Sequence, residues 1–181
     1  MFPGAHLEQN GDKPAVIMGG SGFTETYREL DAAANRLSRL LRSAGFQPGD
    51  HIAICMENHD RYLEIVWGCH YAGLVYTCAS SRLTSHELEY IINDCGAKGY
   101  ITSKYKADQA AEVISTTPNV ELRLMLDGTV DGYESYETAV ASQSPEPLEE
   151  ERVAGLDMLY SSGTTGMPKG VMWRQDDLFG V

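Results

Sequence analysis

The sequence predicts an α/β fold with a mainly parallel sheet and helices on both faces. The first observation is that apolar runs alternate with amphipathic segments through the middle of the chain, which is the pattern of right-handed crossovers in a parallel sheet. The second is that Ile52-Ala53-Ile54-Cys55 is nearly continuous in apolar residues, as strands buried on both faces are. The third is a pair of capping boxes that open two of the helices.

The N-terminal part is predicted to form a hairpin and a long helix. Residues 15–18 and 23–24 flank a glycine-rich turn at 19–22, which favours a hairpin over a dinucleotide-binding loop because the third glycine is missing. Thr26-x-x-Glu29 is a capping box, and apolar residues at helical spacing follow it as far as Gly45.

The strand at 52–55 is followed by two more strand–helix units. Asn58 is expected to cap a helix that ends at Gly73, before a strand at 74–77. Thr84-x-x-Glu87 opens the next helix, which Gly96 ends.

Weaker sequence patterns predict the remaining helices and strands. Strands are expected at 99–102 and 123–126, with a weaker helix over 106–115 between them. A short helix is expected at 136–141. Residues 143–155 are rich in proline and glutamate and read as an acidic surface loop or linker.

Composition narrows the classes of function. The 181 residues carry a formal net charge of −12, which argues against nucleic acid as a partner. No apolar run reaches the roughly 20 residues of a membrane span. Four scattered cysteines, Cys55, Cys69, Cys78 and Cys95, are expected to be buried, reduced thiols, which suits the cytoplasm. No metal site is expected within the chain, and the five histidines are expected to be structural or solvent-exposed.

A loop at 160–171 has the composition of a phosphate-binding site. It runs from the apolar strand Met158–Tyr160 into a second strand at 170–172, and it contains three glycines, several hydroxyls and one lysine. Backbone amides and hydroxyls can converge there on a phosphate. The glycine spacing is not that of a P-loop, because two residues, and not four, separate Gly163 from Gly166. A hairpin without a ligand is the alternative. The expected phosphate-binding residues are Ser161, Ser162, Gly163, Thr164, Thr165, Gly166 and Lys169.

Residues 160–171 resemble the signature loop of the adenylate-forming, or AMP-binding, enzymes, with serine in place of the commoner threonine at Ser161. The resemblance extends from about Lys13 onward. It includes residues 26–30 at the entry of the first long helix, residues 49–54 at the first buried strand, and the alanine–glycine turn at 71–76. Acyl-CoA synthetases, and fatty-acid–CoA ligases in particular, are the most similar members.

The resemblance implies substrates and an activity. It implies activation of a carboxylic acid, expected to be a fatty acid, by ATP to an acyl-adenylate, followed by transfer to coenzyme A. It implies Mg²⁺, with its ligand outside these residues, and no certain catalytic residue within them. Two departures stand out: Cys78 and Ala79 occupy positions where the family has proline and leucine, and Gln175 stands where many members have a histidine near the substrate.

Residues 1–181 are accordingly expected to be the N-terminal portion of the large AMP-binding domain, without its C-terminal remainder, and to be inactive and weak in ATP binding alone. The 161–169 loop is expected to be poorly ordered without nucleotide. A truncated, non-catalytic paralogue that binds nucleotide or a partner protein, and a piece of a peptide-synthetase adenylation domain, remain alternatives. Oligomerisation through a truncated core and peripheral membrane association remain open.

Overall fold

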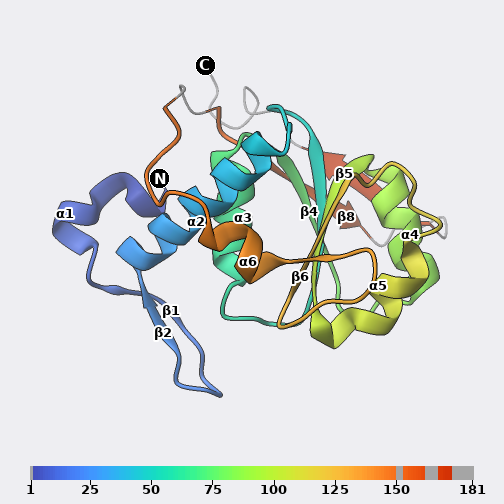
Figure 1. Cartoon of the computed structure of the whole chain (residues 1–181), viewed down its shortest axis with the longest axis horizontal. Helices are drawn as coiled ribbons and strands as arrows, with labels where there is room; N and C mark the ends of the chain where they lie inside the picture. Colours follow the sequence, from blue (N-terminus) through green and yellow to red (C-terminus); the bar gives the residue numbers. More distant parts are fainter. Residues whose placement is uncertain (1, 150–152, 162–166, 173–181) are drawn as a thin grey trace.

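The computed structural model describes residues 2–149, 153–161 and 167–172 (Figure 1). The chain begins with a 3-10 turn, η1, and the short helix α1 (Leu7–Asn10), and a two-stranded antiparallel hairpin follows. The helices and strands after α1 have the following bounds: β1 Pro14–Ile17, β2 Thr24–Thr26, α2 Tyr27–Ser43, β3 His51–Cys55, α3 Tyr62–Tyr71, β4 Val75–Ala79, α4 Ser85–Asp94, β5 Ala97–Ser103, η2 Lys104–Lys106, α5 Ala107–Val113, β6 Leu122–Leu126, β7 Glu134–Ser135, α6 Tyr136–Ala141, β8 Leu156–Ser161 and β9 Lys169–Met172.

The main sheet has seven strands in the order β7-β6-β5-β3-β4-β8-β9. All neighbouring pairs are parallel except β8–β9 at one edge. The predicted mainly parallel sheet is therefore confirmed. Its two expected buried runs lie side by side, with Ala53 opposite Tyr100 and Ile54 opposite Ile101.

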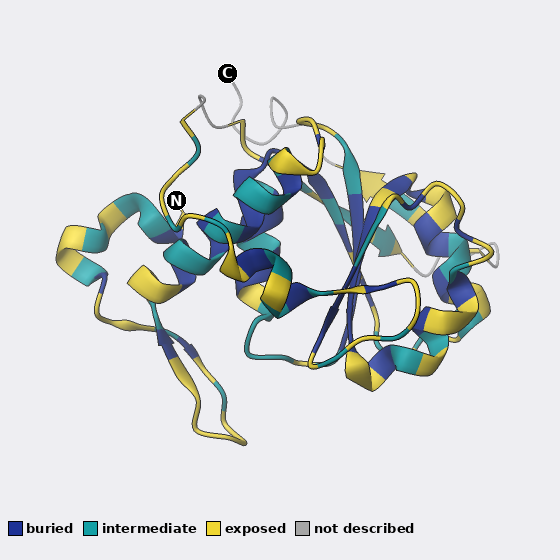
Figure 2. Ribbon diagram, viewed as in Figure 1, coloured by how far each residue is buried: buried dark blue, intermediate teal, exposed yellow. Residues whose placement is uncertain are grey.

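Helices cover both faces of this sheet (Figure 1). Ile52 and Ile54 of β3 belong to the core that also takes in residues of α2, α3 and α6, whereas Ala53 and Cys55 belong to the core formed with α4 and α5. Successive residues of a strand point to opposite faces. Because both faces are covered, Ile52 to Cys55 of β3 are all buried, and the central strands are largely dark blue in Figure 2, which explains the continuous apolar run.

Local capping was predicted correctly at two helices and wrongly at a third. Thr26 and Thr84 each form a complete capping box with the glutamate three residues later. Asn58 does not cap α3, which starts at Tyr62 with no side-chain cap. Just before the helix, the Arg61 backbone nitrogen lies 3.1 Å from His59 Nδ1, a contact that does not cap α3 itself.

The cysteine prediction is wrong at one position. Cys55, Cys69 and Cys95 are buried free thiols, but Cys78 is exposed. Side chains alternate along β4, and Cys78 lies on the same side as Tyr76, which is only half buried. The apolar residues around Cys78 in the sequence did not reveal that this side of β4 is less fully covered.

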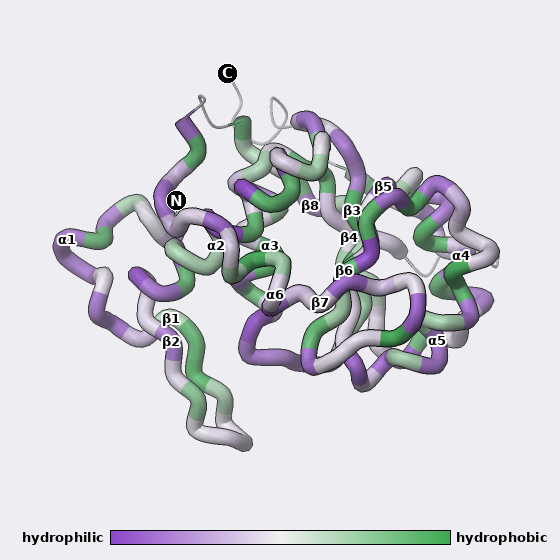
Figure 3. The backbone as a smooth tube through the Cα atoms, viewed as in Figure 1, coloured by the Kyte–Doolittle hydropathy of each residue, from purple (hydrophilic) through white to green (hydrophobic). Residues whose placement is uncertain are grey.

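The hairpin β1–β2 projects from the body of the molecule (Figure 1). Figure 3 shows a hydrophobic stretch along β1 in this projection, and Ile17 there is 67% exposed. The hairpin predicted from the glycine-rich turn is confirmed.

The short helix expected at 136–141 is α6, with the bounds predicted. The described residues 143–149 form neither helix nor strand. They lie along α2, where Arg39 donates hydrogen bonds of 2.7 and 2.6 Å to the carbonyl oxygens of Glu146 and Pro147. Whether this segment acts as a linker stays a prediction.

Candidate functional site

Strands β8 and β9 form the base of the candidate phosphate-binding loop. They pair antiparallel, with Ser161 opposite Lys169 and Tyr160 opposite Gly170. The expectation that the loop closes back into a strand, and does not open a helix, is confirmed. Because β8 is parallel to β4, Ser161 lies at the carboxyl edge of the sheet, where open α/β folds bind their ligands.

The structure describes two of the seven predicted phosphate-binding residues. Ser161 and Lys169 are both exposed, so a hydroxyl and an ammonium group stand opposite each other at the two ends of the loop. The other five, Ser162, Gly163, Thr164, Thr165 and Gly166, lie outside the described residues, as does Gln175. The expected order of the loop without nucleotide therefore stays a prediction.

Helix α4 is attached to both ends of the loop. The Tyr160 hydroxyl donates a 2.6 Å hydrogen bond to Asp94 Oδ2, and the Tyr90 hydroxyl donates one of 3.0 Å to the Pro168 carbonyl. Burial and the hydrogen bond to Asp94 raise the pKa of Tyr160, so this phenol stays a donor at neutral pH. These two contacts determine where the loop starts and ends relative to the sheet.

The sequence did not reveal the contacts of Tyr160, Tyr90 and Asp94. Tyr90 and Asp94 are four residues apart, so a helix places them on one face. Their partners on β8 and before β9 could not be deduced, since the contact depends on how α4 is placed over the sheet edge.

A hollow of about 400 Å³ beside the loop is lined by α4 and Met167. Glu89 and Asp94 line it, and their charge disfavours a phosphate. The described groups that suit phosphate are Ser161 and Lys169 instead.

Close packing at the loop base requires glycine at Gly155. A Cβ on Gly170 would lie 2.1 Å from the terminal methyl of Met158, which is the far end of a flexible side chain and can move. A Cβ on Gly155, which precedes β8, would lie 2.4 Å from the Leu74 carbonyl oxygen. Gly155 therefore lets β8 start beside β4, where the Leu156 amide donates a 3.0 Å hydrogen bond to that same oxygen.

The described ends of the loop do not fit a magnesium site. Ser161 and residues 167–169 contain no carboxylate, and carboxylate oxygens are the protein ligands that Mg²⁺ usually takes. Asp157 is exposed, four residues before Ser161 on β8.

Comparison with known proteins shows the family of the chain. The family model described as AMP-binding enzyme matches residues 5–180. A 3-oxocholest-4-en-26-oate–CoA ligase of Rhodococcus rhodochrous is 35% identical over 173 residues, which are 92% of this chain and 31% of the relative. A fatty acid–[acyl-carrier-protein] ligase, ScoC, of Streptomyces coeruleorubidus is 28% identical over 97% of this chain and 33% of its own.

Among solved structures, the anthranilate CoA ligase AuaEII in complex with anthranoyl-AMP superposes with a TM-score of 0.82. It has 23% sequence identity and covers 90% of this chain and 32% of its own. At that identity the likeness shows the fold alone.

The chain belongs to the AMP-binding enzyme family. It spans about a third of the length of the curated relatives it matches. Among the described residues, no helix is long and apolar enough to cross a membrane.

Proposed function

We propose that a family-length protein containing this chain is an acid–thiol ligase, which activates a carboxylic acid with ATP and transfers the acyl group to coenzyme A. The observation that carries the proposal is the glycine- and hydroxyl-rich loop between β8 and β9, at the carboxyl edge of a parallel sheet. The names of the relatives support a fatty or sterol-derived acid as the substrate.

In the first step two anions, the carboxylate and ATP, would react with each other, and a third anion, pyrophosphate, would be released. A carboxylate oxygen attacks the α-phosphorus of ATP, and the bond to the β-phosphate oxygen breaks, giving acyl-adenylate and pyrophosphate. The second step breaks the acyl–phosphate bond as a thiolate sulfur attacks the acyl carbon, and AMP leaves. Both steps depend on positioning and on donors aimed at phosphate.

Within this proposal the loop binds the β- and γ-phosphates. The Lys169 ammonium and the Ser161 hydroxyl stand at its two ends, opposite one another in the β8–β9 register. Ser162, Gly163, Thr164, Thr165 and Gly166 are proposed to add amides and hydroxyls between them. A charge-assisted hydrogen bond contributes about 2 kcal/mol, so Lys169 is expected to matter most among the single side chains.

The acceptor could be a carrier protein, because the Streptomyces relative is named as a ligase to acyl-carrier-protein. The same adenylation step precedes either acceptor. Assaying thioester formation with coenzyme A and with a phosphopantetheinylated carrier protein separates the two, and coenzyme A is expected to be preferred.

The test is acid-dependent exchange of labelled pyrophosphate into ATP. It is measured on the family-length protein, with fatty acids of several lengths. Lys169→Ala is expected to lower the exchange rate about tenfold to a hundredfold, with Lys169→Arg partly restoring it. Lys98→Ala is the matched control, since Lys98 is an exposed lysine at the amino edge of the sheet that pairs with Asp50 at 2.7 Å.

If the wild-type protein shows no exchange with any of the acids, the proposed ligase activity is refuted. It would favour the non-catalytic alternative, which binds nucleotide without forming an adenylate. Exchange that depends on amino acids, and not on fatty acids, would favour the peptide-synthetase alternative.

A further inference from the structure

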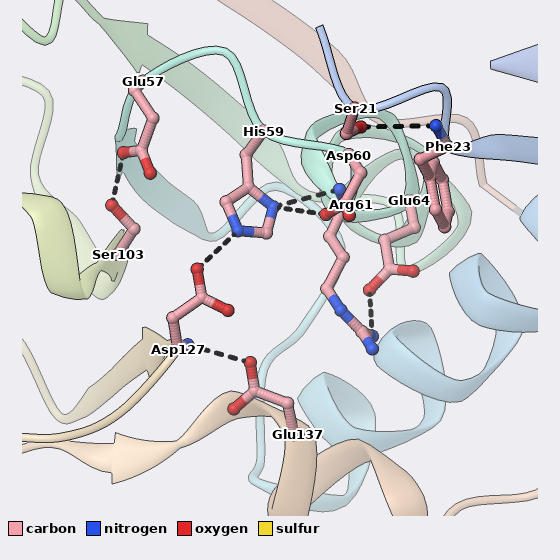
Figure 4. Close-up of polar contacts among 10 residues, drawn as sticks. All are labelled: Ser21, Phe23, Glu57, His59, Asp60, Arg61, Glu64, Ser103, Asp127 and Glu137. Carbon is pink, nitrogen blue, oxygen red and sulfur yellow. Dashed lines mark hydrogen bonds and ion pairs between the residues drawn. The ribbon is translucent and has the colours of Figure 1, made fainter. Parts of the chain in front are cut away.

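A second group of polar side chains lies at the carboxyl ends of β3, β5 and β6 (Figure 4). Glu57 comes two residues after β3, Ser103 is the last residue of β5, and Asp127 directly follows β6. Glu57, His59 and Asp127 each offer one ligand atom, and these three atoms lie within 4.8 Å of one another.

The position is the one where open α/β sheets bind ligands. Strands β3 and β5 are neighbours, but the helix after β3 packs on one face and the helix after β5 on the other. The two crossovers therefore leave in opposite directions, and such a switch point in strand order is where open α/β folds usually bind ligands. Glu57 follows one of these two strands and Ser103 ends the other, and the Ser103 hydroxyl donates a hydrogen bond to Glu57.

His59 is held between two carboxylates. Its Nε2 lies 2.9 Å from Asp127 Oδ2, and its Nδ1 lies 2.8 Å from Asp60 Oδ1. Its side chain is only 10% exposed. Nε2 thus faces Asp127, whereas Nδ1 faces the Asp60 carboxylate and lies 3.1 Å from the backbone nitrogen of Arg61. A carboxylate next to the non-ligating nitrogen is a common partner of a histidine that ligates a metal.

The spacing suits a cation of moderate size. Two ligands at right angles around a metal, with bonds of about 2.1 Å, are about 3 Å apart. The 2.9 Å between His59 Nε2 and Asp127 Oδ2 is close to that separation. The Glu57 carboxylate, whose ligand atom lies within 4.8 Å of the other two, would supply the third ligand.

Asp127 is also held in place by its neighbours. Asp127 has φ +59° and is the one non-glycine residue with positive φ in the part of the chain that the structure describes. Its backbone amide donates a 3.0 Å hydrogen bond to Glu137. The basic side chains next to these residues are engaged elsewhere, Arg61 with Glu64 and Lys104 with the Thr129 carbonyl.

We propose that Glu57, His59 and Asp127 bind a divalent transition-metal cation. One imidazole, two carboxylates and no thiol favour Mn²⁺, Co²⁺ or Zn²⁺ over the alkaline-earth ions. The site does not depend on the proposed ligase activity, and it departs from the expectation that the chain holds no metal. An ion here would join the loop after β3 to the end of β6.

The test uses Mn²⁺, whose electron paramagnetic resonance signal disappears when the ion leaves water for a protein. Titration of the 181-residue chain, without nucleotide, is expected to reveal one saturable site from which Zn²⁺ displaces Mn²⁺. His59→Ala and Asp127→Asn are each expected to weaken binding about tenfold or more. Lys169→Ala is expected to leave it unchanged, which separates this site from the phosphate-binding loop.

Two matched variants control for the acidic surface. His86→Ala removes an exposed histidine on α4, and Asp131→Asn neutralises an exposed aspartate four residues beyond Asp127. Both are expected to bind Mn²⁺ as the wild type does. Weak binding that is equal in all of these proteins would overturn the proposal, because it would reflect net charge alone.

A second measurement keeps the proposal testable if His59→Ala does not fold. Bound Mn²⁺ broadens the nuclear magnetic resonance signals of nearby residues in the wild-type chain. The backbone signals of His59, Ser103 and Asp127 are expected to broaden first. Uniform broadening, or broadening centred on exposed carboxylates elsewhere, would contradict the assignment.

Discussion

Glu25 provides a stability prediction that can be worked out from the structure. Its side chain lies in β2, is 8% exposed, and has one oxygen, Oε2, without a hydrogen-bond partner among the described residues. Burial, and then the negative charge of Glu64, raise the pKa of Glu25 from 4.5 to about 7. Figure 4 shows Glu64 on α3, where Arg61 pairs with it.

The direction of the pH dependence follows from this shift. Between pH 4.5 and 7 the folded protein keeps the Glu25 proton that the unfolded chain has released. The stabilising contribution is therefore complete below about pH 4.5 and is lost as the pH rises through 7. The difference between the two pKa values corresponds to about 3 kcal/mol of unfolding free energy as an upper value.

Urea denaturation of wild type and Glu25→Gln at several pH values from 4.5 to 8 measures this contribution. The wild type is expected to lose about 2 to 3 kcal/mol relative to the variant over that range. The cost of burying the amide does not depend on pH, so it cancels from the comparison. Glu8→Gln, at an exposed site, is the control and is expected to follow the wild type. Parallel pH profiles for wild type and Glu25→Gln would refute the reasoning.

Two further predictions concern the base of the candidate loop. Gly155→Ala is expected to destabilise the chain by about 3 kcal/mol in thermal or urea denaturation, because the new Cβ meets the backbone oxygen of Leu74. Gly19→Ala is the control: it has open space around it and is expected to change stability by less than about 0.5 kcal/mol. Equal effects of the two substitutions would contradict the packing argument. Tyr160→Phe removes the hydrogen bond to Asp94 and is expected to cost about 1 kcal/mol. In a double-mutant cycle with Asp94→Ala, which removes the acceptor, the two changes should not be additive, and additivity would mean that the bond contributes nothing.

The sheet was predictable because its strands are buried on both faces. A strand such as β3 has to be apolar at every position, so Ile52 to Cys55 identify it without any knowledge of its neighbours. Helix starts at Thr26 and Thr84 were predictable for a similar reason, since a capping box is complete within four residues. The sequence does not give the strand order directly, and the reversal between β3 and β5 emerges only from the structure.

The site was predictable only where its chemistry is local. The glycines, hydroxyls and lysine of residues 160–171 are contiguous, so their composition alone indicates phosphate binding. The partners of Asp94 and Asp127 are 66 and 68 residues away in the sequence, and no local sequence pattern predicts such pairs. The start of α3 was missed for a different reason, because this helix begins at Tyr62 without any side-chain cap and so has no local capping signal.

The claim that the loop between Ser161 and Lys169 binds the phosphates of ATP is tested most directly by amide hydrogen exchange over residues 158–172. Exchange is compared in the free chain, with ATP, with tripolyphosphate and with AMP, each at millimolar concentration to allow for weak binding. ATP and tripolyphosphate are expected to slow exchange in this segment, AMP is not, and Lys169→Ala is expected to reduce the protection. Protection by AMP and not by tripolyphosphate, or protection unaffected by the loss of Lys169, would contradict the assignment of the loop to the outer phosphates.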